Sequence, residues 1–186
     1  MIIIIFGPPG SGKGTQAKKI AAHFDIIHLS TGNVFRNAIR EETELGVKIK
    51  NIMDAGQLVP DQTVVDLVEQ TISGKDFDKG YILDGFPRTV EQAVAYDKLL
   101  ARRNESLDSF LSLHVPSEEL IKRMLARGEG RSDDTVEKIK VRLDVYEKET
   151  CPVINHYKKA GIFQSIDGTG SIDKIFNRIL SALPGR

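Results

Sequence analysis

The sequence contains a single cysteine, Cys151, and no excess of charge of either sign. A lone cysteine excludes a disulfide within the chain and a zinc site built from several cysteines, and it favours a reducing compartment. Lysine plus arginine and aspartate plus glutamate number 26 each, so no overall field draws the chain to nucleic acid or to an acidic membrane surface. We therefore expect neither of these as a partner.

Long hydrophobic runs are also missing. The apolar residues 1–6 are too few for the core of a signal peptide, and no basic residues precede them. No later apolar run approaches membrane-spanning length. We expect a cytoplasmic protein that folds as one domain over residues 1–186 and works as a monomer. The histidines show no spacing typical of a metal pair; they are His23, His28, His114 and His156.

Five apolar segments predict the strands of a parallel sheet. Residues 2–6 are β-branched or aromatic and do not alternate with polar residues, which is typical of a strand buried on both faces. Helical patterns lie between this segment and four later strand candidates, so we expect a three-layer α/β/α domain with a five-stranded parallel sheet. The later candidates are residues 26–30, 80–84, 110–115 and 162–166. Plausible helix N-caps are Asp61, Thr89, Ser117 and Ser171, and plausible stops or turns are Gly46, Gly74, Gly128 and Gly161.

Residues 7–15 read Gly-Pro-Pro-Gly-Ser-Gly-Lys-Gly-Thr and follow the first strand directly. Glycines let backbone N–H groups point inward, a helix that begins near Lys13 offers its positive end, and the lysine adds a mobile charge. A strand, a glycine loop and a helix are the context of a P-loop, so a polyphosphate site is predicted, with a ligand-free turn as the alternative. The loop residues expected to bind the phosphates are Gly10, Ser11, Gly12, Lys13, Gly14 and Thr15.

The loop departs from the general pattern at Gly14. Serine or threonine usually follows the lysine, whereas here Thr15 comes one residue later. The hydroxyl that commonly binds magnesium is therefore displaced. We expect the metal to be held mainly by phosphate oxygens and water.

Three further motifs suggest a family. Residues 30–36 read Ser-Thr-Gly-Asn-Val-Phe-Arg, residues 56–60 read Gly-Gln-Leu-Val-Pro, and residues 84–92 read Asp-Gly-Phe-Pro-Arg-Thr-Val-Glu-Gln. With the P-loop they resemble adenylate kinase over essentially the whole chain, and the short spacing of Arg127 and Arg131 resembles its short-lid form. The resemblance implies reversible transfer of the γ-phosphoryl group of MgATP to AMP, giving two ADP.

The resemblance also implies an AMP site, in which Arg36 and Arg88 hold the phosphate and Gln92 reads the adenine edge. A guanidinium binds phosphate oxygens in pairs, and a side-chain amide both donates to and accepts from a purine. Solvated surface arginines are the alternative for Arg36 and Arg88, and a capping box begun by Thr89 is the alternative for Gln92. The implied AMP-binding residues are Thr31, Arg36, Gln57, Leu58, Val59, Gly85, Phe86, Pro87, Arg88, Gln92, Arg131 and Arg142.

Arg123 and Arg127 lie four residues apart on one expected helix, so both project from the same face. The resemblance places these two arginines and Gly170 on the ATP side. A salt bridge with Glu119 is the alternative for Arg123, and a plain turn is the alternative for Gly170. The implied catalytic residues are Lys13, Arg88, Arg123, Arg131 and Arg142.

Magnesium is the expected cofactor, bound with ATP. Asp84 ends a predicted strand, where we expect its carboxylate to accept hydrogen bonds from metal-bound waters. Asn33 departs from the family, which usually has aspartate there, so this chain lacks one charge that attracts the metal. The chain also lacks the insertion and the cysteines of the zinc-bearing family members, so no structural zinc is expected.

Two segments are expected to act as mobile covers that exclude water from the site: residues 30–60 as the AMP-binding segment, and residues 127–134 as the short lid. Helical patterns over 34–41 and 47–53 lie within the first. A UMP or CMP kinase of the same family is an alternative, although Thr31 and Gln92 argue against it because the pyrimidine-directed relatives typically have alanine and asparagine there. A nucleotide-dependent switch is a distant alternative, because the chain has no Asn-Lys-x-Asp guanine-binding motif.

Overall fold

The computed structural model describes residues 1–126 and 135–183. All five strands of its sheet run parallel in the order β2-β3-β1-β4-β5, so the predicted fold class is confirmed. Four strands begin or end one residue away from their predicted positions, and the first matches at both ends. The strands are β1 (Ile2–Phe6), β2 (Ile27–Ser30), β3 (Tyr81–Asp84), β4 (Ser109–His114) and β5 (Phe163–Asp167).

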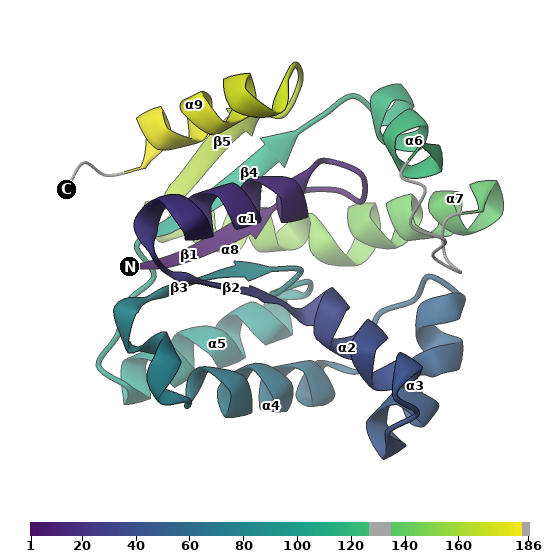
Figure 1. Ribbon diagram of the computed structural model, residues 1–186, viewed down its shortest axis with the longest axis horizontal. Coiled ribbons are helices and arrows are strands. Elements are labelled where there is room, and N and C mark those ends of the chain that lie inside the picture. Colours follow the sequence, from purple (N-terminus) through teal and green to yellow (C-terminus); the bar gives the residue numbers. More distant parts are fainter. Residues whose placement is uncertain (127–134, 184–186) are drawn as a thin grey trace.

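Alternate residues of β1 pack against opposite layers of helices, as expected for a strand that is buried on both faces. Ile3 and Ile5 belong to the core beneath two helices, and Ile4 and Phe6 belong to the core beneath three others. Figure 1 shows these layers on the two sides of the sheet. The first layer holds α1 (Lys13–Phe24) and α9 (Ile172–Ala182), and the second holds α4 (Asp61–Ile72), α5 (Val90–Arg102) and α8 (Pro152–Lys159).

The remaining helices gather at the carboxyl ends of the strands, on the right of Figure 1, whereas the N-terminus lies at the opposite edge. Ligands of parallel sheets bind beyond the carboxyl ends of the strands, so these helices border the expected site. They are α2 (Thr31–Arg40), α3 (Glu44–Asp54), α6 (Ser117–Leu125) and α7 (Val136–Val145). A 3-10 turn, η1 (Lys75–Lys79), precedes β3, and a π-helical turn, η2 (Tyr146–Thr150), joins α7 to α8. None of the helices within the described ranges is both long and apolar enough to cross a membrane.

Gly46 does not end a helix, so the prediction of a stop there is wrong. It lies in the first turn of α3, where a Cβ atom would come within 2.1 Å of the carbonyl oxygen of Ala38 in α2. Glycine is required because the two helices cross in backbone contact. The interruption between them comes instead at residues 41–43.

Two of the four predicted N-caps are confirmed. The hydroxyls of Thr89 and Ser171 accept hydrogen bonds from backbone N–H groups in the first turns of α5 and α9. Asp61 and Ser117 are instead the first helical residues of α4 and α6, and the preceding prolines occupy the cap positions. Proline fixes an extended entry to the helix, which shifts the cap by one residue.

Candidate active site

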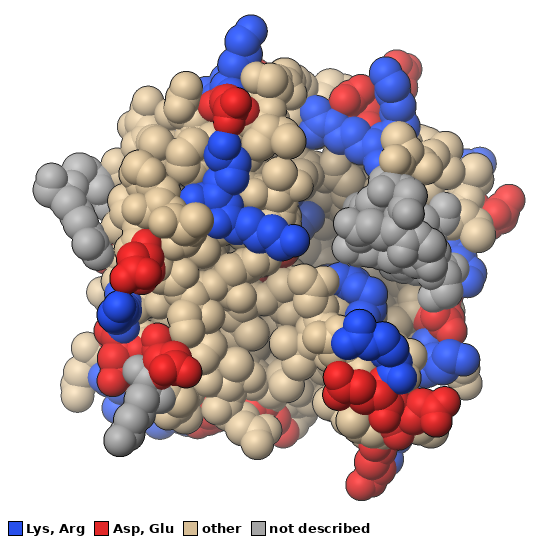
Figure 2. Space-filling view, in the orientation of Figure 1, with Lys and Arg blue, Asp and Glu red and all other residues tan. Residues whose placement is uncertain are grey.

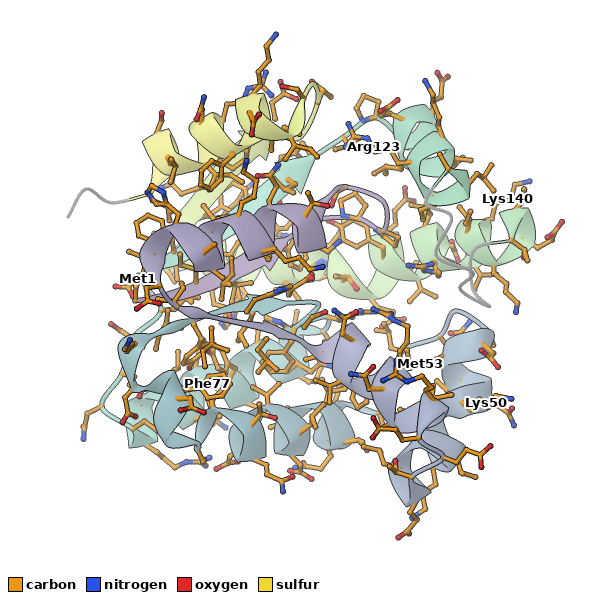
Figure 3. The ribbon with its side chains drawn as sticks, viewed as in Figure 1. Met1, Lys50, Met53, Phe77, Arg123 and Lys140 are labelled. Carbon is orange, nitrogen blue, oxygen red and sulfur yellow. The ribbon has the colours of Figure 1, made fainter. Side chains whose placement is uncertain are left out.

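A cavity of about 830 Å³ opens at the carboxyl edge of the sheet. Figure 2 shows the hollow on this face with lysine and arginine side chains on its rim. In Figure 3, Arg123 on α6 and Met53 on α3 lie on opposite sides of the site, and both line the cavity. Such a cavity bordered by basic groups suits an anionic ligand of nucleotide size.

The P-loop adopts a conformation that needs its glycines. Gly10 and Gly12 have φ angles of 83° and 91°, and a Cβ atom on Gly10 would come within 2.7 Å of the Leu120 carbonyl oxygen. Lys13 begins α1, and its Nζ atom donates to the carbonyl oxygens of Gly7 at 2.7 Å and Pro8 at 2.8 Å. The ammonium is thus held over the loop, beside the positive end of the helix.

The departure at Gly14 has a steric reason. A Cβ atom on Gly14 would lie 3.3 Å from Oδ2 of Asp84, so a larger residue would crowd that carboxylate. Burial opposes ionisation of Asp84, but the His28 ring, 3.4 Å away, and the charges of Lys13 and Arg88 outweigh it and hold the pKa of Asp84 below its ordinary value. Asp84 is therefore a carboxylate placed directly against the P-loop helix.

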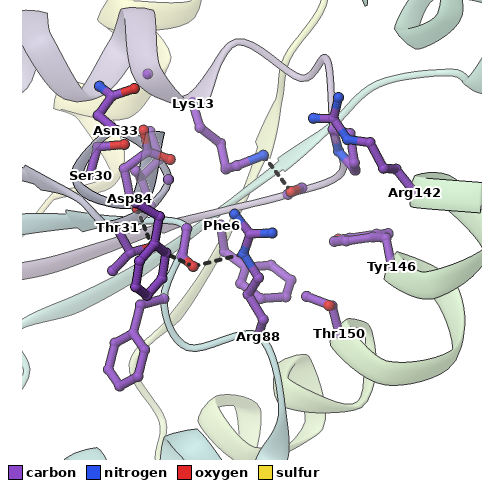
Figure 4. Close-up of a pocket in the computed structure, with 18 of the residues that line it drawn as sticks. Phe6, Lys13, Ser30, Thr31, Asn33, Asp84, Arg88, Arg142, Tyr146 and Thr150 are labelled. Carbon is purple, nitrogen blue, oxygen red and sulfur yellow. Dashed lines mark hydrogen bonds between the residues drawn. The ribbon is translucent and has the colours of Figure 1, made fainter. Parts of the chain in front are cut away.

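Thr31 and Arg88 are joined through the turn after β3. The carbonyl oxygen of Gly85 accepts from Oγ1 of Thr31 at 3.0 Å and from Nε of Arg88 at 2.8 Å. Figure 4 shows the terminal nitrogens of Arg88 pointing toward the space occupied by the Lys13 side chain. The backbone of the turn thus fixes one edge of the guanidinium and aims the other edge into the cavity.

Arg36 folds back along the first turn of α2. Its Nη2 atom donates to the side-chain oxygen of Asn33, and its guanidinium lies so close to Gly32 that a Cβ atom there would be 3.2 Å from Nη1. Asn33 therefore contacts Arg36 through its side-chain oxygen. The structure brings Arg36, Arg88 and Lys13 to one cavity, as the sequence predicts.

Gln92 lines the cavity and is 1% exposed. Its Oε1 atom accepts from the backbone N–H of Arg88 at 2.8 Å, and its Nε2 atom donates to Asp61 at 2.8 Å. Its own backbone N–H donates to Thr89 Oγ1 at 3.1 Å. The Thr89 half of the capping box therefore exists, but the Gln92 side chain accepts from the N–H of Arg88, one residue before the cap. Each end of the amide keeps one further hydrogen-bonding position.

Arg123 lines the cavity and also forms the salt bridge raised as its alternative. Its Nε atom donates to Glu119 at 2.8 Å, and its Nη1 atom donates to the carbonyl oxygen of Gly168 at 3.1 Å. These contacts tie α6 to the loop between β5 and α9. Gly170 has a φ of 100° in that loop, as a turn requires, and lies outside the cavity lining. Arg127 and Arg131 lie outside the described residues.

Arg142 reaches the cavity from α7 and packs against the turn at Gly56. A Cβ atom on Gly56 would come within 3.0 Å of Cγ of Arg142. Two cavity residues on the same side, Tyr146 and Thr150, were missed. The intervals of four residues from Arg142 to Tyr146 and from Tyr146 to Thr150 were a signal that the three share a face, and the π-helical turn η2 keeps the latter two directed inward. Figure 4 shows both beside Arg88 and Arg142, and the Tyr146 ring centroid is 5.8 Å from that of Phe6.

Most of the other predicted site residues also line the cavity. Ser11 does not line it but is buried beneath the loop, 3.5 Å from the Lys13 ammonium. Predicted residues that do line it, besides those above, are Gly10, Gly12, Thr15, Gln57, Leu58, Val59, Phe86 and Pro87. Lining residues that were not predicted include Lys18, Lys19, His28, Phe35, Met53 and Val64.

Comparison with known proteins settles the family. The family model described as "Adenylate kinase" matches residues 5–162. The chain belongs to the adenylate kinase family. It is 48% identical to adenylate kinase of Phocaeicola vulgatus over 183 residues, covering 97% of each chain. It is 48% identical to adenylate kinase of Mycobacterium sp. (strain MCS) over 183 residues, covering 98% of this chain and 99% of that protein.

A third relative differs in length. Adenylate kinase of Carboxydothermus hydrogenoformans is 45% identical over 212 aligned residues, covering 98% of this chain and 99% of that protein. That alignment is longer than the 186 residues of this chain, so it includes positions that this chain lacks. The predicted family is confirmed, and the alignments over 183 residues accord with the short form.

Proposed function

We propose that this protein transfers the γ-phosphoryl group of MgATP to AMP and gives two ADP, in a reversible reaction. The observation that carries the proposal is the convergence of Lys13, Arg88 and Arg142 on one cavity between the P-loop and α7 (Figure 4). These cations come from three elements that are distant in sequence. Phosphoryl transfer needs this kind of positioning and charge stabilisation, and little covalent help from the protein.

ATP is assigned to the P-loop side. The loop from Gly10 to Thr15 and the start of α1 hold the donor phosphates, with Lys13 as the mobile charge. Arg123 belongs to this side because its contact with Gly168 places it beside the loop that carries Gly170. Arg127 is assigned here on the family resemblance alone.

AMP is assigned to the opposite side, between α2 and the turn after β3. Arg36 and Arg88 hold its phosphate, and apolar residues including Val59, Phe35 and Val64 enclose the base beside Gln92. Arg142, with Arg131, neutralises charge on the transferring group. A general base is not required, because a phosphate oxygen of AMP is already an anionic nucleophile.

Magnesium is the proposed cofactor and supplies charge neutralisation between the donor phosphates. The described residues contain no group of three or more histidine, cysteine or acidic side chains able to hold a metal. We assign most of the ligands of the ion to phosphate oxygens and water. Asp84 fits such an ion because its ionised carboxylate lies against Gly14 at the start of α1. Its role is to accept hydrogen bonds from the waters of the ion.

We further propose that residues 30–60 and 127–134 act as covers that close over the nucleotides and keep water from competing with AMP. The first comprises α2, α3 and the turn 55–60, and it contacts α7 through Gly56. The second lies outside the described residues. We also propose that the protein works as a monomer, and that it works in the cytoplasm, a reducing compartment with which the single cysteine accords.

The test is a coupled assay of ATP plus AMP, with and without Mg²⁺. Two ADP per turnover, dependent on Mg²⁺ and on AMP, is the expected result. Inorganic phosphate as the product, at a rate indifferent to AMP, would overturn the proposal. CMP, UMP and GMP as acceptors are expected to give a much slower reaction.

A further inference from the structure

The side-chain amide of Gln92 is held in one of its two possible orientations. A rotation of the amide by 180° exchanges the oxygen, which accepts, with the nitrogen, which donates. The choice between these orientations decides which purine edge the amide matches. In this chain two neighbouring groups make that choice.

The first group is the backbone N–H of Arg88, which can only donate, and it faces Oε1 at 2.8 Å. The second is the carboxylate of Asp61, which can only accept when ionised, and it faces Nε2 at 2.8 Å. Reversal of the amide would set N–H against N–H and oxygen against oxygen. Because Gln92 is 1% exposed, water has little access to relieve such a mismatch.

The backbone is fixed as well. Thr89 Oγ1 accepts from the backbone N–H of Gln92 at 3.1 Å, which anchors the first turn of α5. Asp61 is anchored independently, as the first residue of α4, and α4 packs against α5. The contact between Asp61 and Gln92 thus joins the starts of two helices, and it orients the amide from the side away from the cavity.

The held orientation suits adenine. The two contacts use one acceptor position of Oε1 and one N–H of Nε2, and we assign the second lone pair and the second N–H to the base. Adenine offers a donor at N6 and an acceptor at N1, which pair with that oxygen and that N–H. Hypoxanthine and guanine offer an acceptor at O6 and a donor at N1, which would meet like groups.

We propose that Asp61 is a positioning residue that sets the preference of the monophosphate site for adenine over the 6-oxopurines. It acts through Gln92 and does not touch the nucleotide. The inference rests on the proposed function, since it requires AMP to be the acceptor. It goes further by assigning base selectivity to a residue outside the cavity lining.

The test compares kcat/KM for AMP with kcat/KM for IMP in Asp61→Ala, Asp61→Leu and Asp61→Asn, with MgATP as donor. Loss of the acceptor in Asp61→Ala is expected to lower the AMP-to-IMP ratio about tenfold, which corresponds to roughly 1.4 kcal/mol for one buried hydrogen bond. Asp61→Leu removes the same acceptor, so the AMP-to-IMP ratio is measured in this variant if Asp61→Ala does not fold. Asp61→Asn keeps a carbonyl acceptor, so its ratio is expected to stay within about threefold of the wild-type value.

The chain offers a matched control. Gln62 donates to Asp66 at 2.6 Å on the exposed surface of the same helix, so Asp66→Ala removes a similar pair outside the cavity. Its AMP-to-IMP ratio is expected to be unchanged, whatever happens to its melting temperature. A purely structural role for Asp61 would move the melting temperature and leave the ratio alone.

Each failure has its own signature. If the wild-type protein phosphorylates AMP but Asp61→Ala and Asp61→Leu keep its AMP-to-IMP ratio, the inference about Asp61 is wrong and the proposed function stands. If Gln92→Ala also keeps the wild-type ratio, the amide does not read the base. If the wild-type protein does not phosphorylate AMP, the proposed function itself fails.

Discussion

Thr31 and Arg88 donate hydrogen bonds to the same acceptor, the carbonyl oxygen of Gly85. The shared contact joins the start of α2 to the turn after β3, which are the two walls of the proposed AMP site. It uses the Nε edge of Arg88 and leaves the terminal nitrogens directed into the cavity (Figure 4). Arg88 is therefore held in place before a phosphate arrives, which lowers the entropic cost of binding.

Arg88→Ala is expected to lower kcat about 10³-fold, the lower end of the range for a catalytic arginine in phosphoryl transfer. Arg88→Lys is expected to recover little, because lysine has no Nε–H to donate to Gly85 and cannot bind phosphate oxygens in pairs. Steady-state kinetics with circular dichroism as the control for folding would test this. An alanine variant with most of its activity intact would refute the assignment.

Lys13→Met is expected to lower kcat about 10²- to 10³-fold, by removal of a preorganised charge from the donor phosphates. The methionine retains most of the side-chain volume, so the melting temperature should stay close to the wild-type value. The decrease in kcat should be seen at saturating concentrations of AMP and MgATP. Lys19→Met is a suitable control, because Lys19 also lines the cavity but its ammonium contacts Asp173, 2.5 Å away. Equal losses in both variants would speak against a special role for Lys13.

Gly46→Ala is expected to destabilise the AMP-binding segment. Its Cβ atom would lie 2.1 Å from the Ala38 carbonyl oxygen, so α2 and α3 must separate, at a cost of about 1–3 kcal/mol. For a domain of this size the melting temperature would fall by roughly 2–4 °C for each kcal/mol. The KM for AMP should rise, because α2 carries Thr31 and Arg36, while the KM for MgATP should change little. Gly161→Ala is a control without a steric clash, because nothing lies within 4 Å of its Cβ position. It measures the effect of backbone strain alone.

The free energy of unfolding is expected to fall at alkaline pH, and ionisation of Tyr81 contributes to this fall. Burial raises the pKa of Tyr81 to about 12, and its hydroxyl pairs with that of Tyr96 at 3.0 Å. A group with a raised pKa stabilises the fold fully below its unfolded pKa of about 10, and that contribution is lost as the pH rises toward 12. Tyr81→Phe should therefore show a shallower loss of unfolding free energy over this window, measured by urea denaturation. An unchanged slope would contradict the linkage.

The sequence was sufficient to predict the sheet and the P-loop because their signals are local. A β-branched run such as β1 and a glycine-rich loop ending in Lys13 determine their own backbone conformation within a few residues. The contact of Gln92 with Asp61 was not predicted, because the residues are 31 positions apart and meet only when α4 packs against α5. The approach of α3 to α2 at Gly46 was missed because it too depends on how two helices pack, although Gly46 and Ala38 are only eight positions apart.

Side chains with several possible partners were also beyond prediction. Asn33 was considered for its effect on the metal, but its side-chain oxygen accepts from Arg36 within the same helix. Arg123 was assigned to the ATP side with a salt bridge to Glu119 as the alternative; its guanidinium forms that salt bridge, and its contact with Gly168 was not predicted. A pattern of residue types shows which groups are available, whereas the packing of α6 against the loop after β5 decides which of them meet.

The central claim is that the P-loop lysine and the arginines of α7 and of the turn after β3 surround phosphates passing between two adenosine nucleotides. A crystal structure with a bisubstrate analogue, in which two adenosines are joined by five phosphates, tests it most directly. The account predicts that Lys13, Arg88 and Arg142 contact the phosphate chain, and that one adenine lies against Gln92. A complex in which these side chains face solvent, or in which neither adenine reaches Gln92, would contradict it.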